Sequence, residues 1–405
     1  MRIAITLFSL LALACTSASA VVPDMSHTRI APLVRATGEF GLSLFSRLHA
    51  EAGSKNLFMS PLSIQMALLM TYGGARGTTA QAMDSTLRLG GMDPATAAQT
   101  ARAYLDDVVR HAGGVRFSIA NSIWHRPNLT CLPEFLHLAR GVMQAGVHKL
   151  DFARPDAADR INDWIADKTE NMIKKVLDSI PEDAMMYLVN AIFFHGTWTT
   201  SFDTAQTKNE AFNKDDGSSQ PVPMMRQSDR FRYHADARGA AVELPYGDGR
   251  FAMLAILPAQ RGNMREYLGS LDWAELSRIR QSLRQREGEV RIPRFNLSWG
   301  VKDLVDQLKA MGMGLAFSDA ADFSGITGKR DLTIDKVLHK AVIEVDEKGT
   351  KAAAVTVVGM KATSSMHMDR EIPFRFVADR PFVFVIVDTR TGMPVFTGVM
   401  HSPGG

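Results

Sequence analysis

The amino-acid sequence predicts a mixed α/β (α+β) fold whose sheets are mostly antiparallel. Helical periodicity dominates the first half of the chain, and segments of strand length dominate the second half. Residues 185–194 form a continuous apolar run of strand length, which is typical of a sheet buried on both faces. Hydrophobic residues make up 46% of the chain and charged residues 22%, so there is enough apolar material for a large core.

Three helices are expected in the first half. Apolar residues recur at helical spacing over residues 30–49 and predict an amphipathic helix. Ser60 and Pro61 then form a helix start, because Ser caps free N–H groups and Pro is tolerated in the first turn. The run that follows, residues 64–72, is apolar almost all round, so this helix is expected to be central. A third helical stripe covers residues 161–176.

Most other apolar segments have strand length. A further helix is expected over residues 301–311. The predicted strands are residues 117–124, 185–194, 240–244, 251–257, 290–295, 332–334, 341–345, 382–388 and 393–399.

The N-terminus has the features of an export signal. Residues 1–20 contain one Arg, an apolar run and a small-residue cleavage site, so we expect a signal peptide and a secreted, extracellular or periplasmic protein. No linker divides residues 21–405, which predicts a single domain. Lipoprotein anchoring through Cys15 is a minor alternative. If Cys15 leaves with the signal, Cys131 is the only thiol, and no internal disulfide forms.

Charge and motif content argue against several function classes. Lys and Arg total 46 and Asp and Glu 43, and they are scattered, so we expect no nucleic-acid partner. No further apolar run is long enough for a membrane span. The sequence has no G-x-S-x-G, H-E-x-x-H, P-loop or G-x-G-x-x-G motif, and its 11 His lack metal-ligand spacing. We therefore expect no metal, no cofactor and no enzyme, with an exported hydrolase as the enzymatic alternative.

The unusual segment is residues 347–381, which joins two predicted strands and is far longer than the usual connection of about 4–6 residues. If it were extended, one face would carry only uncharged side chains, so the segment could become a buried strand, and Gly349 would give its base backbone freedom. Composition alone favours an Ala/Ser/Thr-rich surface loop over this interpretation. The residues of that face are Thr350, Ala352, Ala354, Thr356, Val358 and Met360.

Five motifs, in order, resemble the serpin family from about residue 30 to the end. They are NLFMSPLS at 56–63, NAIFFHGTW at 190–198, ADFSGI at 321–326, HKAVIEVDEKGTKAAA at 339–354 and DRPFVF at 379–384. The resemblance implies a serpin fold with three β-sheets, about eight or nine helices and an exposed reactive-centre loop at about 348–372.

The resemblance also implies three groups of site residues. The first is a polar shutter through which the main sheet opens: Ser60, Ser63, Asn190 and His339. The second is a breach at the top of the sheet: Trp198, Arg294 and Glu347, with an ion pair expected between the last two. The third is the hinge of the loop: Glu347, Gly349, Thr350, Ala352, Ala353 and Ala354. No residue is expected to be catalytic.

The activity that the resemblance implies is inhibition of serine proteases as a suicide substrate. The cleaved loop would enter the main sheet and trap the acyl-enzyme. Family loop length places the scissile bond at Thr363–Ser364, which suits elastase-like or subtilisin-like proteases. Lys361 would instead favour trypsin-like enzymes, and Met360 or Met366 chymotrypsin-like ones. Lys351 and Val355 depart from the family pattern on the outward face.

The main alternative is a non-inhibitory serpin that acts as a carrier or chaperone. Such members carry charged or bulky residues on the inward face of the hinge, unlike Thr350, Ala352 and Ala354. We expect a monomer. Two glycosylation sequons begin at Asn128 and Asn296, and their occupancy is not fixed by the sequence.

Overall fold

The computed structural model describes residues 27–110, 113–350 and 374–404. The predicted signal peptide and Cys15 lie outside the described residues, as does the greater part of the predicted loop, residues 351–373. The described chain combines helices with two large sheets and agrees with the predicted α+β class.

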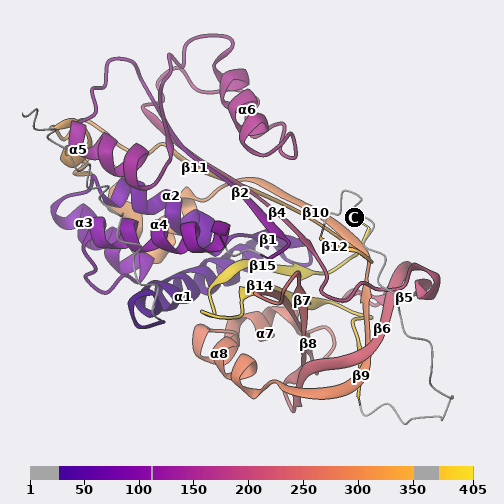
Figure 1. The fold of residues 1–405 in the computed structure, drawn as a ribbon. Helices are drawn as coiled ribbons and strands as arrows, with labels where there is room; N and C mark the ends of the chain where they lie inside the picture. The colour runs from indigo at the N-terminus through magenta and orange to yellow at the C-terminus, as the bar shows by residue number, and fades with distance from the viewer. Residues whose placement is uncertain (1–26, 111–112, 351–373, 405) are drawn as a thin grey trace, which may run out of the picture.

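The N-terminal helices, α1 to α5, gather at one end of the molecule, beside the sheets (Figure 1). The central one, α2 (Pro61–Tyr72), is buried at all of its 12 positions, as its nearly continuous apolar sequence predicts. Ser60 caps it by accepting a hydrogen bond from Ser63 N, and Pro61 occupies the first turn. The other helices are α1 (His27–Ala52), α3 (Gly77–Leu87), α4 (Pro94–Arg110), α5 (Pro133–Leu136), α6 (Ala157–Lys168), α7 (Met264–Ser270), α8 (Trp273–Ser282), α9 (Val305–Leu308) and α10 (Ser324–Thr327).

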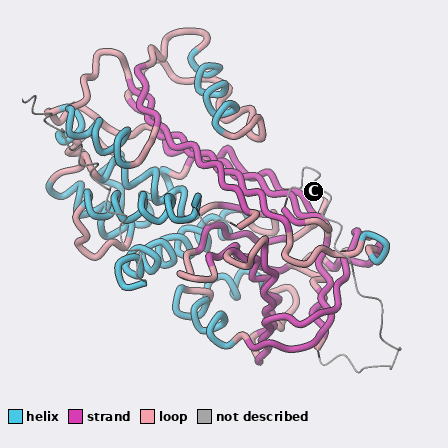
Figure 2. Tube along the Cα trace, viewed as in Figure 1, coloured by secondary structure: helices cyan, strands magenta, loops and turns pink. Residues whose placement is uncertain are grey.

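A six-stranded sheet runs along the length of the molecule, with α6 over one of its faces (Figures 1 and 2). Its strand order is β10-β11-β12-β4-β2-β3. Ile161 and Ile165 of α6 pack with Tyr187, Val189 and Leu338 of the sheet. The strands are β2 (Val115–His125), β3 (Gly146–Lys149), β4 (Met186–Thr197), β10 (Phe295–Asp303), β11 (Lys336–Asp346) and β12 (Gly349–Thr350).

The second sheet has nine strands, in the order β1-β15-β14-β8-β7-β6-β9-β13, with β5 paired to β6. Every residue of β8, β14 and β15 is buried, which explains their continuous apolar sequences. The strands are β1 (Leu57–Met59), β5 (Lys208–Asn213), β6 (Ser219–Asp236), β7 (Gly239–Tyr246), β8 (Phe251–Pro258), β9 (Arg284–Pro293), β13 (Arg375–Val377), β14 (Phe382–Asp388) and β15 (Pro394–Met400).

The number of sheets and helices differs in detail from the expectation. The described residues form two hydrogen-bonded sheets where three were expected, because the 18-residue β6 pairs with β5 and β9 along one part and with β7 at its end. Within the same residues, ten α-helical segments replace the eight or nine expected, and three of them have only four residues.

Three element boundaries depart from the sequence prediction. The helix expected over 161–176 ends at Lys168, and Glu170 and Asn171 then adopt left-handed φ values of 51° and 62°. The segment expected to be helical from 301 is still strand β10 as far as Asp303. Residues 332–334 form no strand, although Leu332 and Ile334 are buried.

Candidate functional site

The candidate site is the gap between β4 and β11 at the centre of the six-stranded sheet. These two strands pair in parallel from Lys336 opposite Tyr187 to Val342 opposite Phe193. Beyond that level they separate, and β12 lies between them, antiparallel to both. Thr350 is opposite Val345 on one side and Gly196 on the other. The base of the long segment after Glu347 is therefore already part of the sheet.

Gly349 and Thr350 are shaped for this position. Gly349 has φ +150°, and a Cβ there would lie 2.2 Å from the carbonyl oxygen of Gly196, so only glycine fits without displacing β4. Thr350 is fully buried, and its Oγ1 is 2.8 Å from the Tyr246 hydroxyl. The predicted hinge thus contains a glycine required by close approach and, next to it, a small side chain that faces inward.

An aromatic pair fixes the turn that precedes β12. The ring of Trp198 stacks on Tyr246 with centroids 4.3 Å apart. Trp198 Nε1 donates to the carbonyl oxygen of Asp346 at 2.8 Å, and its backbone N–H donates to that of Lys348 at 2.9 Å. Burial raises the pKa of Tyr246, so its hydroxyl stays protonated and can bond Thr350.

The expected ion pair of Glu347 and Arg294 is present. Arg294 Nη2 lies 2.5 Å from Glu347 Oε1, which also accepts a hydrogen bond from Thr207 Oγ1 at 2.6 Å. Burial alone would raise the pKa of Glu347, but the hydrogen bonds from Arg294 and Thr207 outweigh it, and the pKa is lowered. Glu347 is therefore ionised and anchored on two sides.

The four expected shutter residues also come together, at the N-terminal end of α2. His339 Nδ1 lies 2.5 Å from Asn190 Oδ1, and Ser60 N donates to His339 Nε2 at 3.2 Å. Asn190 Nδ2 lies 2.5 Å from Ser63 Oγ and 2.5 Å from Asn121 Oδ1. Asn121, Asn190 and His339 are register partners, so they form one polar row across β2, β4 and β11.

This polar row is uncharged. His339 is fully buried, and burial lowers its pKa to about 3, so the imidazole is neutral at physiological pH. Because Nε2 accepts from Ser60 N, the ring proton sits on Nδ1 and is donated to Asn190 Oδ1. All four side chains of the cluster are buried and hydrogen-bonded.

The structure describes only part of the predicted loop. Glu347, Gly349 and Thr350 are placed as given above, whereas the other predicted loop positions lie outside the described residues. These positions are Lys351, Ala352, Ala353, Ala354, Val355, Met360, Lys361, Thr363, Ser364 and Met366.

Three site residues were not predicted from the sequence: Asn121, Thr207 and Tyr246. Asn121 could have been singled out only as a polar residue inside an apolar strand. No local sequence pattern marks Thr207 or Tyr246 as a site residue.

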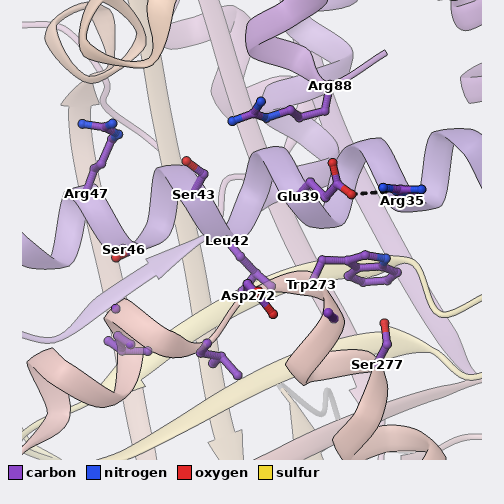
Figure 3. A pocket seen from close by; sticks show the side chains of 14 residues that line it. Arg35, Glu39, Leu42, Ser43, Ser46, Arg47, Arg88, Asp272, Trp273 and Ser277 are labelled. Atoms are coloured by element: carbon purple, nitrogen blue, oxygen red, sulfur yellow. Dashed lines mark hydrogen bonds and ion pairs between the residues drawn. The ribbon is translucent and has the colours of Figure 1, made fainter. Parts of the chain in front are cut away.

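A separate hollow lies between α1 and α8 (Figure 3). Its volume is about 810 Å³, and it is open to solvent. Arg35 and Glu39 form an ion pair of 2.6 Å on the α1 side, and Trp273 of α8 lines the opposite side (Figure 3). Within residues 27–110, 113–350 and 374–404, no group of three or more His, Cys, Asp and Glu is arranged to hold a metal ion. No helix in those ranges is long and apolar enough to cross a membrane.

Comparison with known proteins gives consistent matches. A family profile described as Serpin (serine protease inhibitor) matches residues 35–403. An uncharacterized serpin-like protein of Thermococcus kodakarensis is 34% identical over 376 residues, or 92% of this chain and 86% of that protein. Leukocyte elastase inhibitor of Bos taurus is 33% identical over 383 residues, or 92% and 99%. The crystal structure of human thyroxine-binding globulin complexed with thyroxine matches with a TM-score of 0.84 and 25% identity, over 93% of this chain and 100% of that one.

Proposed function

Because this chain belongs to the serpin family, we propose that it inhibits serine proteases as a suicide substrate. Its similarity to leukocyte elastase inhibitor supports protease inhibition. Its similarity to thyroxine-binding globulin means that family membership alone does not separate inhibitors from carriers. The argument for inhibition therefore rests on the gap in the sheet.

The observation that carries the proposal is the register around β12. The β11–β4 ladder is parallel, so a single strand placed between them can be antiparallel to both, as β12 already is. Continuing the register of β12 pairs residues 351–359 with β11 down to Lys336 and with β4 down to Tyr187. Once β4 and β11 separate, the loop can thus extend β12 without changing the register of either neighbouring strand.

The same register decides which loop side chains become buried. Residues an even number of positions from Thr350 share its inward face: Ala352, Ala354, Thr356 and Val358. In that register Thr356 lies opposite both His339 and Asn190. These are the two polar residues that move apart when β4 and β11 separate. The Thr356 hydroxyl can donate and accept, so it suits a polar level of the sheet.

In the proposed reaction the protease supplies all of the catalytic groups. Its serine Oγ attacks the carbonyl carbon of Thr363, the C–N bond to Ser364 breaks, and the new amine of Ser364 takes the proton. The freed loop inserts and carries the acylated protease along, which distorts its active site. A displacement of about 1 Å can slow an enzyme on the order of a hundredfold, so deacylation stalls.

Insertion provides the driving force. It exchanges one parallel ladder for two antiparallel ladders, with a net gain of about ten backbone hydrogen bonds. At about 0.5–1.5 kcal/mol each, this gain is comparable with the whole stability of a domain, about 5–15 kcal/mol. The trap is therefore effectively irreversible.

The proposal includes export, with residues 1–20 removed as a signal peptide and residues 21–405 as one domain. A secreted or periplasmic inhibitor would meet elastase-like or subtilisin-like proteases, as Thr363 indicates. N-terminal sequencing of the protein recovered from outside the cell tests this part, and a chain that retains residue 1 would contradict it.

The second candidate function is that of a carrier, and the hollow between α1 and α8 is the observation in its favour. A volume of about 810 Å³ is enough for a small molecule. A carrier that does not insert its loop should bind a ligand there and show no protease adduct. Screening a hormone and lipid panel by thermal shift measures that outcome.

The test of inhibition is a denaturing gel after incubation with pancreatic elastase, subtilisin, trypsin and chymotrypsin. An adduct at the summed mass of the two proteins, resistant to boiling in detergent, is the expected result. Mass spectrometry of the released C-terminal peptide identifies the cleaved bond. If all four enzymes only digest or ignore the protein, the proposal fails, and turnover of generic esters by the protein alone would instead indicate a hydrolase.

A further inference from the structure

Three arginines converge on one buried carboxylate beside the distal end of the long loop. Glu289 of β9 has a side chain only 2% exposed. Its Oε1 lies 2.9 Å from Arg291 Nε and 3.4 Å from Arg375 Nη2, and its Oε2 lies 2.5 Å from Arg226 Nη2. Arg375 begins β13, the first described strand after residues 351–373. We call Arg226, Arg291 and Arg375 the arginine cluster.

The arrangement of the cluster is not explained by sheet stability. Arg226 and Arg291 are direct register partners on neighbouring strands, and like charges in that position are destabilising. Glu210 pairs with Arg291 at 3.0 Å, so two carboxylates face three guanidiniums. One positive charge therefore remains uncompensated within the five groups.

The uncompensated charge faces solvent. The side chains of Arg226 and Arg375 are 41% and 60% exposed, while that of Arg291 is 18% exposed. Each guanidinium has five N–H donors, and the Glu289 carboxylate uses only a few of them. The buried Glu289 holds the outer arginines in place with donors free for an external carboxylate.

We propose that the arginine cluster is an interaction surface for proteases that carry acidic side chains around their substrate cleft. This inference rests on the proposed function, because the partner is the enzyme that attacks the loop. Arg375 is the second residue after that segment in the chain, so an enzyme that binds its C-terminal end would be close to β13 and its neighbour β9. Attraction between the cluster and an acidic rim raises the rate of encounter.

The cluster variant combines Arg226→Gln with Arg375→Gln. The matched control variant combines Arg284→Gln with Arg286→Gln. Both pairs remove two positive charges. Arg284 and Arg286 are exposed and lie an odd number of residues from Glu289 on β9, so they point to the other face of the strand. Thermal unfolding of both variants checks that they are folded. Glutamine retains a neutral amide donor and adds no carboxylate beside Glu289.

The probes are anionic and cationic trypsin, which cut after the same residues and differ in net surface charge. The measured quantity is the second-order rate constant for attack within residues 351–373, counted as adduct plus cleaved chain. This sum measures how fast the protease attacks the loop, whether or not an adduct forms. A protein that is cleaved but not inhibitory is therefore distinguished from one whose arginine cluster does not attract the protease. At 0.15 M salt the Debye length is about 8 Å, so local charges dominate.

We expect the cluster variant to react about threefold to tenfold more slowly with anionic trypsin at 0.15 M salt, and the difference to vanish at 1 M salt. Cationic trypsin should react equally with variant and parent, and the control should match the parent with both enzymes. Equal rates of anionic trypsin with the cluster variant and the parent would overturn the proposal. Loss of heparin-column retention with unchanged rates would overturn it in favour of a polyanion.

Discussion

Replacing Thr350 with arginine should convert the proposed inhibitor into a substrate. Thr350 is fully buried between β11 and β4, and its hydroxyl bonds Tyr246 in a space bounded by Gly196 and Val345. An arginine at this position must either bury an unpaired guanidinium, at a cost of several kcal/mol, or leave the sheet. Either way the first step of insertion is lost, because no later residue can enter before Thr350.

The expected size follows from the barrier. A penalty of about 3 kcal/mol on the entry path slows insertion roughly a hundredfold, since each 1.4 kcal/mol is a factor of ten. Deacylation of the undistorted protease then precedes insertion, and cleaved chain accumulates without adduct. The assay is the number of moles of inhibitor consumed per mole of protease inactivated, which should rise by at least tenfold.

The matched control is Lys351→Glu, which changes the charge of the next residue. In the register of β12 this residue belongs to the opposite, outward face, so trapping should stay nearly intact. Thr350→Ser, which keeps the hydroxyl for Tyr246, should also behave as the parent. Equal consumption by Thr350→Arg and Lys351→Glu would refute the assignment of faces from which the mechanism is argued.

Three further predictions follow from the same geometry. Cleavage near Thr363 should raise the melting temperature by tens of degrees, because about ten hydrogen bonds are added to one domain, and an unchanged melting temperature would indicate a loop that stays out of the sheet. Tyr246→Phe should lower the protection of the Gly349 and Thr350 amides in hydrogen exchange by about 0.5–1.5 kcal/mol, since it removes the bond to Thr350 Oγ1, with adduct formation retained. The pKa of His339 is about 3 in the folded chain and about 6.5 in the unfolded chain. Between pH 3 and pH 6.5 only the unfolded chain therefore binds a proton at this residue. The free energy of unfolding should fall by about 1.4 kcal/mol for each unit by which the pH is lowered from 6.5 toward 3. Urea unfolding of the parent and of His339→Gln at pH 7 and pH 5 measures this term, and equal pH dependence of the two would contradict the assigned pKa.

The strongest sequence patterns predicted their elements correctly because burial left no ambiguity. All but the first residue of the apolar run 185–194 lies within β4, and the run 64–72 lies within α2. The helix expected over 161–176 failed where polar contacts replace helical ones: Thr169 caps the end, and Asn162 Oδ1 accepts from the backbone N–H of Val176 and Leu177. Ile173 and Val176 are buried by this turn and not by a helix face.

The candidate site divides in the same way. Residues within the family motifs, such as Asn190 and His339, could be expected from the sequence to lie close together. The residues that complete the site are brought there by the pairing of strands that are distant in the sequence. Asn121 joins the polar row only because β2 pairs with β4 at that level, and Tyr246 reaches Thr350 from the other sheet. Pairing between distant strands depends on how the whole sheet assembles, so no local pattern contains it.

In the proposed mechanism, the polar row at the centre of the sheet lowers the cost of opening it. Separation of β4 from β11 breaks the hydrogen bond between Asn190 Oδ1 and His339 Nδ1, because the two residues lie on the two strands that part. Asn190 keeps its contacts with Ser63 and Asn121, and His339 keeps the N–H of Ser60. A row of apolar side chains would instead expose its whole contact area at the moment of opening. In the proposed mechanism, opening at this level therefore exchanges one side-chain hydrogen bond, which water or the hydroxyl of Thr356 can replace, in addition to the backbone ladder between β4 and β11.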